Sequence, residues 1–531
     1  MDSQERNQAA ETAAEKISKE AAETAIRRET TEKTMDKVDD FVSGFDREDS
    51  MTDPKANRLE ADDLEAGSPE ADNSTETDSL NGAGNAITEG SIWKQLLLFF
   101  FPILIGSFFQ QLYNTVDTVV VGRYVGKEAL AAVGTTGILI NLLIGFFIGI
   151  ASGASVIISQ YFGGRDHKNL SKAVYTAFGL GIIGGLIITV LGLALAKPAL
   201  RLINVPEEVL PQSLTYMRII FAGVSGGVVY NIGTGIFRAI GNSRYPLYVL
   251  IICCLINIVL DLLFVVAFHW DVMGVALATV LAQLCSSVLV MRKLTASKES
   301  YRLEVKKIRI HRDILRNIMR IGLPAGFQSV LYSVSNLVVQ RSINGFGTNT
   351  LAAWSAISRV DGFVWMVMGA FGISVSTFVG QNFGAGNYDR VLKGTRTCLL
   401  LTGGATLVLS VIEIVFAGPI LRIFTGDEAV VALGTEFARI WAPAYLLYVF
   451  IEIYAAAIRG TGESVYPTLI TLIGVCGLRF FWVGFVVPRW NVPQALAACY
   501  PVTWGITAVI FIVYYLRKNW LKRGIGRKAA A

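Results

Sequence analysis

Residues 238–246 read Arg-Ala-Ile-Gly-Asn-Ser-Arg-Tyr-Pro, and residues 459–467 read Arg-Gly-Thr-Gly-Glu-Ser-Val-Tyr-Pro. Arg, Gly, Ser, Tyr and Pro therefore recur in the same order at an offset of 221 (459 minus 238). The same offset relates Leu-Ala-Ala at 130–132 to Leu-Ala-Ala at 351–353. Separated matches that share one spacing indicate an internal repeat, so the chain contains two copies of one structural unit.

The composition is that of a protein embedded in a membrane. The chain is 53% hydrophobic and only 17% charged, and its mean hydropathy is +0.49. Apolar runs of about 20 residues cross a hydrocarbon core roughly 30 Å thick, and runs of that length predict helices rather than barrel strands. Twelve spans are predicted: 95–121, 129–158, 172–196, 212–237, 246–268, 272–294, 317–341, 350–380, 394–417, 433–458, 465–487 and 492–516.

Each copy of the repeat holds six of these spans. The predicted fold is therefore an all-α integral membrane protein, with two six-helix lobes around a central cavity, an arrangement typical of secondary transporters. The predicted domains are a tail over residues 1–90, an N-lobe over 91–299, and a loop, C-lobe and basic C-terminus over 300–531. The connections on one side of the predicted membrane carry 26 Lys and Arg, against seven on the other side. That bias predicts that both termini are cytoplasmic. We expect the chain to lie in the plasma (inner) membrane.

The tail differs from the rest of the chain. Residues 1–90 hold 24 acidic and 10 basic residues and few large apolar ones, which predicts a disordered segment. The remainder is basic, which favours contact with anionic lipid over nucleic acid. The six cysteines form no CxxC pair and fall in or beside spans, so they are interpreted as packing residues. The sequence has no nucleotide-binding P-loop, no HExxH motif and no nucleophile–base pattern, so we expect neither an enzyme nor a cofactor, and we expect a monomer.

Acidic residues inside apolar spans are the most informative group, because a charge at membrane depth is costly and needs a reason. Asp117 lies late in the first span. Asn257 and Asp261 lie in the fifth span, four residues apart and so on one helical face. Thr279 lies in the sixth. These oxygen-bearing side chains suit Na⁺ or a proton shared between carboxylates, although the aspartates could instead pair with helix backbone.

The second copy offers an internal comparison. Alignment of the repeats places Asn336 opposite Asp117, and an aromatic residue, Phe481 or Trp482, opposite Asp261. The acids are thus missing from the second copy, as expected if they serve function rather than folding. One cation site, in the first copy only, is the prediction.

Two further acids lie within spans of the second copy. Asp361 follows Arg359 by two residues and is expected to pair locally or to face the cavity. Glu452 lies seven residues before Arg459, on the same helical face.

The face of the first span that carries Asp117 also carries Tyr113 and Gln110, four and seven residues earlier. An aromatic ring and an amide one turn apart suit a flat amphipathic cation. They could equally serve only as hydrogen-bonding partners of neighbouring helices. With Asn114 and Gln283 they are the candidate residues of a substrate cavity.

These residues resemble the multidrug and toxic compound extrusion (MATE) family, in particular its prokaryotic DinF-like branch. The resemblance spans about residues 91–520 and rests on Pro102, on Gln-Gln-Leu-Tyr-Asn-x-x-Asp at 110–117, on the Asn257 and Asp261 pair and on Thr279. It implies that Asp117, Asn257, Asp261 and Thr279 form an N-lobe cation site, and that the first helix bends at Pro102. The chain departs from the family at Leu262, where Pro is frequent, and at Gln328, where some relatives have an acid.

The sequence therefore predicts a secondary antiporter that exports organic, cationic and amphipathic compounds in exchange for H⁺ or Na⁺ by alternating access. A flippase for lipid or lipid-linked oligosaccharide is the main alternative. Such flippases usually have more spans and several cationic residues in the cavity, whereas here Arg residues lie mostly at span ends. A membrane-embedded enzyme or sensor is a further alternative, disfavoured by the repeat.

Overall fold

The structure, a computed structural model, describes residues 87–203 and 205–530, and within these ranges all regular secondary structure is helical. The helices are α2 (Ile92–Val120, continued by the π-helix Val121–Val125), α3 (Lys127–Gly163), α4 (His167–Leu202), α5 (Leu210–Ala239), α6 (Arg244–Asp261, continued by the π-helix Leu262–Ala267), α7 (Asp271–Ala296), α8 (Arg312–Asn344), α9 (Thr348–Gly384), α10 (Tyr388–Phe424), α11 (Glu428–Trp441), α12 (Tyr445–Gly460), α13 (Val465–Thr471), α14 (Leu478–Phe481), α15 (Val487–Trp490), α16 (Pro493–Ala497), α17 (Cys499–Leu516) and α18 (Asn519–Ala530).

These helices make up the twelve predicted spans. Eleven stretches of the described chain are long and apolar enough to cross a membrane. The twelfth span is α8, which has 33 residues but opens with several charged ones. Five spans are not single α-helices. The spans of α2 and α6 end in π-helices, α11 and α12 are joined by a 3-10 turn at Ala442–Ala444, α13 to α15 are joined by π-helical turns, and α16 and α17 follow each other closely. The predicted all-α, twelve-helix fold is confirmed.

The repeated motif that opens the sequence forms the same turn in both copies. Gly241 and Gly462 follow the ends of α5 and α12 with φ of +93° and +86°. That left-handed conformation is accessible to glycine at little cost and is common just after a helix. The amide of each glycine donates to the carbonyl of the motif's Arg, at 3.0 Å to Arg238 and 2.9 Å to Arg459. The repeated motif thus ends a helix in each copy, in addition to showing that the chain contains a duplication.

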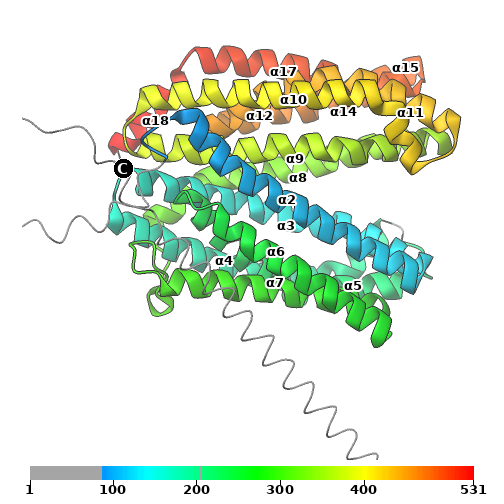
Figure 1. The fold of residues 1–531 in the computed structure, drawn as a ribbon, viewed down its shortest axis with the longest axis horizontal. Coiled ribbons are helices and arrows are strands. Elements are labelled where there is room, and N and C mark those ends of the chain that lie inside the picture. Colours follow the sequence, from blue (N-terminus) through cyan, green and yellow to red (C-terminus); the bar gives the residue numbers. More distant parts are fainter. Residues whose placement is uncertain (1–86, 204, 531) are drawn as a thin grey trace, which may run out of the picture. The chain divides into compact units, whose positions relative to one another are not determined.

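Two clusters of buried hydrophobic residues form the cores of the two repeats, but the first helix of each repeat begins in the other repeat's core. Leu96 and Phe100 of α2 belong to the cluster built mainly from α9 to α17. Ile314 and Ile318 of α8 belong to the cluster built mainly from α3 to α7. In Figure 1, α4 to α7 gather on one side and α10, α12 and α17 on the other, and α2 crosses between them. The two helices therefore tie the repeats together.

Close contact between the repeats depends on glycines in α3, α8 and α9. A methyl group added to Gly149 would lie 2.4 Å from the backbone nitrogen of Gly326, and one on Gly163 would lie 2.0 Å from the carbonyl oxygen of Gln381. One on Gly384 would lie 1.9 Å from the carbonyl oxygen of Gln160. Small residues let helix backbones approach closely in membranes. We call the end of the bundle marked by Gly163 and Gly384 the joined end.

Two hydrogen bonds related by the repeat link the two halves at the joined end. Gln160 Nε2 donates to the Gly460 carbonyl at 2.8 Å, and Gln381 Nε2 donates to the Ala239 carbonyl at 2.7 Å. Donors and acceptors are each 221 residues apart in sequence. Each glutamine of one repeat thus binds the last turn of a helix in the other repeat.

Towards the opposite end, the same helices face open space. Methyl groups added to Gly134 and Gly137 of α3, or to Gly362 and Gly369 of α9, would meet no other atom within 4 Å. The glycines in the other half of α3 are tightly covered. The two repeats are therefore held together at the joined end, and these stretches of α3 and α9 are uncovered.

The residues just before α2 also lie at the joined end. Ile87 is buried, and its carbonyl accepts from Asn382 Nδ2 at 3.3 Å. Arg390 donates to the carbonyl of Gly90 at 2.9 Å. The predicted disordered tail over 1–90 lies outside the described residues up to residue 86.

Candidate cation site in the first repeat

The structure brings together the four residues predicted to form a cation site. Asp117 comes from α2, Asn257 and Asp261 from α6, and Thr279 from α7. Thr279 Oγ1 donates to Asp117 Oδ2 at 3.4 Å, and Asn257 and Asp261 lie beside the same carboxyl group. Exposed fractions range from 0% at Asp261 to 7% at Asp117. Three helices thus deliver these polar side chains to one buried place.

Local helix geometry orients the α6 pair. Asn257 and Asp261 are one turn apart and therefore share a face. Directly after Asp261 the α-helix changes into the π-helix Leu262–Ala267. A π turn widens the helix locally and is frequent at functional sites. Leu262 thus begins a segment of altered helix geometry.

Most polar atoms of this cluster lack a partner within the described residues. Asp117 Oδ1, both carboxyl oxygens of Asp261 and both amide atoms of Asn257 make no hydrogen bond of normal geometry. The described ion pairs include neither aspartate. Buried carboxylates need a cation, a proton or hydrogen bonds to offset the loss of water. A set of carboxyl, amide and hydroxyl oxygens fits a hard cation such as Na⁺, or a proton shared between the acids.

The candidate substrate residues lie on the same side of α2. Tyr113 is half-buried, interacts with Gln283 of α7 and lies near Asp117. Gln110 and Asn114 are exposed. On the predicted shared face of α2, Tyr113 therefore lies next to the acidic cluster, whereas the side-chain amides of Gln110 and Asn114 are exposed.

Two further residues bear on this face. Tyr216 of α5 is buried and close to both Tyr113 and Asp117, and the sequence reasoning missed it. A single tyrosine inside an apolar span gave no signal that could have found it. Pro102 lies inside α2, fifteen residues before Asp117, and α2 is helical on both sides of it. A bend at Pro102 stays a prediction.

The corresponding place in the second repeat holds a cation of its own. Arg479 of α14 is only 2% exposed, and its Nη1 donates to Asn336 Oδ1 at 2.9 Å and to Ser335 Oγ at 3.4 Å. Its guanidinium lies 4.5 Å from the centre of the Tyr500 ring. The described ion pairs do not include Arg479. Asn336, the predicted counterpart of Asp117, thus binds a permanent positive charge.

The aromatic residues predicted opposite Asp261 do not reach this place. Phe481 is 56% exposed, and the Trp482 indole donates to the Ala495 carbonyl at 2.8 Å. The π-helical turns Leu472–Gly477 and Trp482–Val486 add residues to the helix turns here, so a fixed offset loses register. Arg479, two residues before Phe481, contacts Asn336 instead.

The other acids of the second repeat are placed as follows. Asp361 does not pair with Arg359 among the described residues; it accepts a hydrogen bond from the Tyr445 hydroxyl instead. The Glu452 carboxyl packs against Gly372 of α9, where an added methyl group would lie 2.4 Å from Oε1. Glu413 of α10 is a buried acid that sequence reasoning missed. The signal was present, because Glu413 lies within the predicted span 394–417.

Comparison with known proteins agrees with this architecture. The MatE family model matches residues 102–263 and 324–483, one match in each repeat and more than half of the chain. The chain belongs to the MatE family. This MatE protein is 29% identical over 446 residues to the probable multidrug resistance protein YoeA of Bacillus subtilis, with 82% of this chain and 96% of that protein covered.

Solved structures with this fold show the MatE architecture in more than one state. One, described as the outward-facing conformation of a multidrug resistance MATE family transporter of the MOP superfamily, superposes with a TM-score of 0.76 at 21% identity, covering 85% of this chain and 98% of that one. Another, described as MATE in the bent conformation, gives a TM-score of 0.77 at 21% identity, covering 84% and 99%. At such identities the likeness shows the fold. This MatE protein is thus a multi-pass membrane transporter by family and architecture.

Proposed function

We propose that this protein is a secondary antiporter that exports organic, cationic and amphipathic molecules in exchange for H⁺ or Na⁺. The observation that carries the proposal is the buried cluster of Asp117, Asn257, Asp261 and Thr279, whose oxygens lack cationic partners among the described residues. Tyr113 and Gln283 lie next to it. The relatives named as multidrug resistance and multidrug export proteins support drugs and similar organic compounds as the substrate class.

Alternating access gives each structural feature a role. The joined end closes one side of the bundle by glycine contacts and by the two glutamine hydrogen bonds, which are reversible contacts. Cation entry at Asp117 would change the shape of α2, whose first half packs in the core of the second repeat. A bend at Pro102 would transmit that change, since proline lacks the amide hydrogen that a regular helix uses. Bent and straight conformations described for a MATE relative support such a motion.

The available energy is sufficient for export. One monovalent cation that moves down about 100 mV yields about 2.3 kcal/mol. At about 1.4 kcal/mol per tenfold, this supports a gradient of roughly 50-fold for a neutral substrate. Coupling further requires that cation and substrate prefer different states of the transporter, because a ligand that binds both equally shifts nothing.

The basic residues set the orientation within this proposal. The connections at the joined end, including the one between α7 and α8, are rich in Lys and Arg, and this bias supports a cytoplasmic location for them. The protein would then lie in the plasma membrane with both termini inside. It would act as a monomer without a cofactor, against membrane lipid and without nucleic acid.

The flippase alternative requires a cationic cavity for pyrophosphate. Arg479 is the cation buried deepest in the second repeat, but its guanidinium is committed to Asn336, Ser335 and Tyr500. Its exposed fraction of 2% leaves little surface for a phosphate group. The site geometry therefore favours a transported cation over a lipid pyrophosphate.

Reconstitution into liposomes tests the proposal. The purified chain, with an imposed pH or Na⁺ gradient, is expected to move a fluorescent organic cation against its gradient, and Asp117→Asn is expected to stop this movement. Asp313→Asn, at an exposed acid in the first turn of α8, is the matched control and should transport normally. Transport that persists in Asp117→Asn, or that ignores both gradients, would contradict the proposal. Scrambling of labelled lipid would favour the alternative.

A further inference from the structure

Two carboxyl groups lie side by side inside the second repeat. Asp361 is on α9 and Glu413 on α10, and each interacts with the other. The hydroxyl of Tyr445, at the start of α12, donates to Oδ1 of Asp361. Exposed fractions are 8% for Asp361, 2% for Glu413 and 0% for Tyr445. The pair is thus nearly sealed from water.

Glu413 has no normal hydrogen bond to either carboxyl oxygen within the described residues. The titratable groups that face the pair are Tyr445 from α12 and Tyr500 from α17. The ion pairs of the described chain include neither acid. Two adjacent carboxylates cannot both be ionised while they are sealed from water, so one of them must hold a proton in this state of the transporter.

The first repeat shows that the fold does not require acids here. The residues 221 positions before Asp361, Glu413 and Tyr445 are Ile140, Gly192 and Val224. Ile140 and Val224 are buried, and a methyl group on Gly192 would lie 2.2 Å from the Phe221 ring. The first repeat thus fills the same place with hydrocarbon. Because acids at membrane depth are costly, their presence in one copy alone points to a functional role.

We propose that Asp361 and Glu413, with Tyr445, form a proton-binding site of the second repeat that loads and releases one H⁺ in each transport cycle. On loading, one O–H bond forms between a proton from water and a carboxylate oxygen, and the second acid accepts a hydrogen bond from it. Release requires that the site opens to water, where that O–H bond breaks, the proton returns to water and both carboxylates are hydrated. The transport cycle in this proposal is that of the proposed antiport, so this part rests on the proposed function. Binding of the proton to the site does not depend on antiport.

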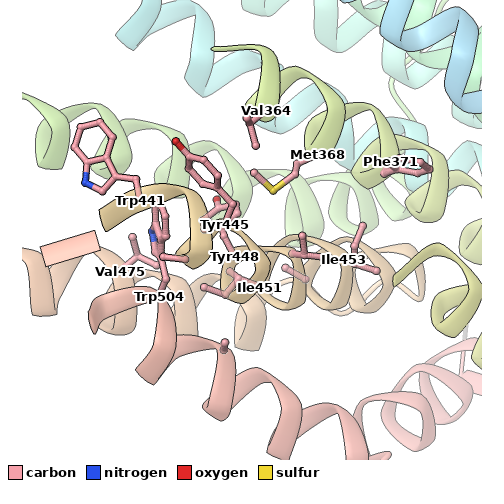
Figure 2. Close-up of a cluster of buried hydrophobic side chains, with 14 of the residues drawn as sticks. Val364, Met368, Phe371, Trp441, Tyr445, Tyr448, Ile451, Ile453, Val475 and Trp504 are labelled. Carbon is pink, nitrogen blue, oxygen red and sulfur yellow. The ribbon is translucent and has the colours of Figure 1, made fainter. Parts of the chain in front are cut away.

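The placement of the pair fits entry of protons from the side opposite the joined end. Asp361 lies 20 residues before Gln381 along α9, which corresponds to about 30 Å of helix. It is also the most exposed member of the site. Figure 2 shows Tyr445 in a buried cluster with Val364, Met368 and Trp504, where Val364 lies one turn after Asp361. This packing fixes the Tyr445 hydroxyl against the carboxyl group.

A proton fits the site better than a metal ion. Hard metal ions such as Ca²⁺ take six or more oxygen ligands, and the pair with Tyr445 offers fewer side-chain groups.

Infrared difference spectroscopy of the purified full chain tests proton binding without transport. The carboxylic acid band of the wild type is expected to titrate with pH, and part of it should disappear in Glu413→Gln and in Asp361→Asn. Glu436→Gln, at an exposed glutamate of α11, is the control and should leave the band unchanged. Tyr445→Phe keeps both acids and should move the midpoint of the titration without removing the band. Spectra of the acid variants that match the wild type would overturn the proposal.

Transport stoichiometry provides the second measurement. In liposomes with a pH difference of one unit, loss of one exchanged proton should lower the substrate gradient at steady state about tenfold in Glu413→Gln, while export continues. A gradient equal to that of the wild type would show that the site does not take part in exchange. If the wild type exports nothing but the Glu413-dependent band titrates, the proposed function fails and the proton site stands. If export is normal and no such band exists, the proposed function stands and the proton site fails.

Discussion

Removal of the two glutamine hydrogen bonds at the joined end should release that end of the transporter. Gln160 and Gln381 each donate to a carbonyl of the other repeat, at 2.8 and 2.7 Å. Gln381 is 1% exposed, so its side chain is held in a fully enclosed place. Gln160→Ala with Gln381→Ala leaves both carbonyl groups without these donors while the joined end is closed. In the separated state, water can bind the same groups, so the double variant favours separation.

The expected shift follows from the usual net value of a hydrogen bond. One such bond contributes about 1 kcal/mol, so the two together contribute about 2 kcal/mol to the closed state. At about 1.4 kcal/mol per tenfold, the equilibrium should move about 30-fold towards separation, and about fivefold for each single variant. The two glutamines lie close to each other, so departures from additivity of about 0.5 kcal/mol or more are expected.

Distances between spin labels on the two repeats report this equilibrium. Lys168 and Asp389 are exposed positions just past the joined end, related by the repeat offset, and accept labels after substitution by Cys. Cys285 is the half-buried cysteine and is replaced first, since the other five are buried. The long-distance population should increase in the double variant in liposomes.

Gln340→Ala is the matched control, because the Gln340 amide donates to Asn344 of its own helix at 3.1 Å. Gly163→Ala should act in the same direction as the double variant and more strongly, since its methyl group would lie 2.0 Å from a backbone oxygen. If the double variant gave the same distance distribution as Gln340→Ala, the joined end would not depend on the glutamines and the reasoning would be wrong.

Three other predictions concern coupling, substrate and orientation. Asp117→Asn should abolish gradient-driven export at normal protein level, which transport in vesicles measures. Asn336→Ala should retain export but lower the free energy of unfolding by about 1–3 kcal/mol, because the buried Arg479 loses its hydrogen-bond acceptor. Denaturation curves measure this second effect. Tyr113→Ala should reduce resistance unequally across a panel of dyes and antibiotics; an equal loss together with reduced protein level would indicate a packing role. Cys introduced at the exposed Lys298 should resist an impermeant thiol reagent on intact cells, and rapid labelling would reverse the orientation.

Sequence periodicity and the repeat were sufficient to predict the fold. The twelve spans follow from the length of apolar runs, and the shared offset predicts equal helices, as in α3 and α9 with 37 residues each. The meeting of Asp117 with Thr279 was predicted by the cost of acids in hydrocarbon together with the resemblance to a family. Such reasoning identifies residues that need a partner.

The partners themselves were harder to predict. Arg479 binds Asn336 in a span that contains π-helical turns, and a constant sequence offset predicts neither those turns nor this contact. The contact between Asp361 and Tyr445 joins residues 84 positions apart on different helices. Packing of α2 and α8 into each other's repeat was also not predicted, since helix boundaries alone do not determine which core a helix enters.

The two repeats distribute charge differently, and this difference restricts where coupling can occur. Arg479 keeps its positive charge in every state, so its place beside Asn336 cannot exchange a cation. A ligand changes a conformational equilibrium only if it binds the two states with different affinity. The guanidinium of Arg479 is part of the chain, so it cannot bind or dissociate as a ligand does. Exchangeable charge is therefore confined to acids that lack such a partner. Among the described residues, our proposals assign this role to the Asp117 cluster in the first repeat and to the Asp361 and Glu413 pair in the second. Cation entry would then act on each repeat through different helices, although the two repeats share one fold.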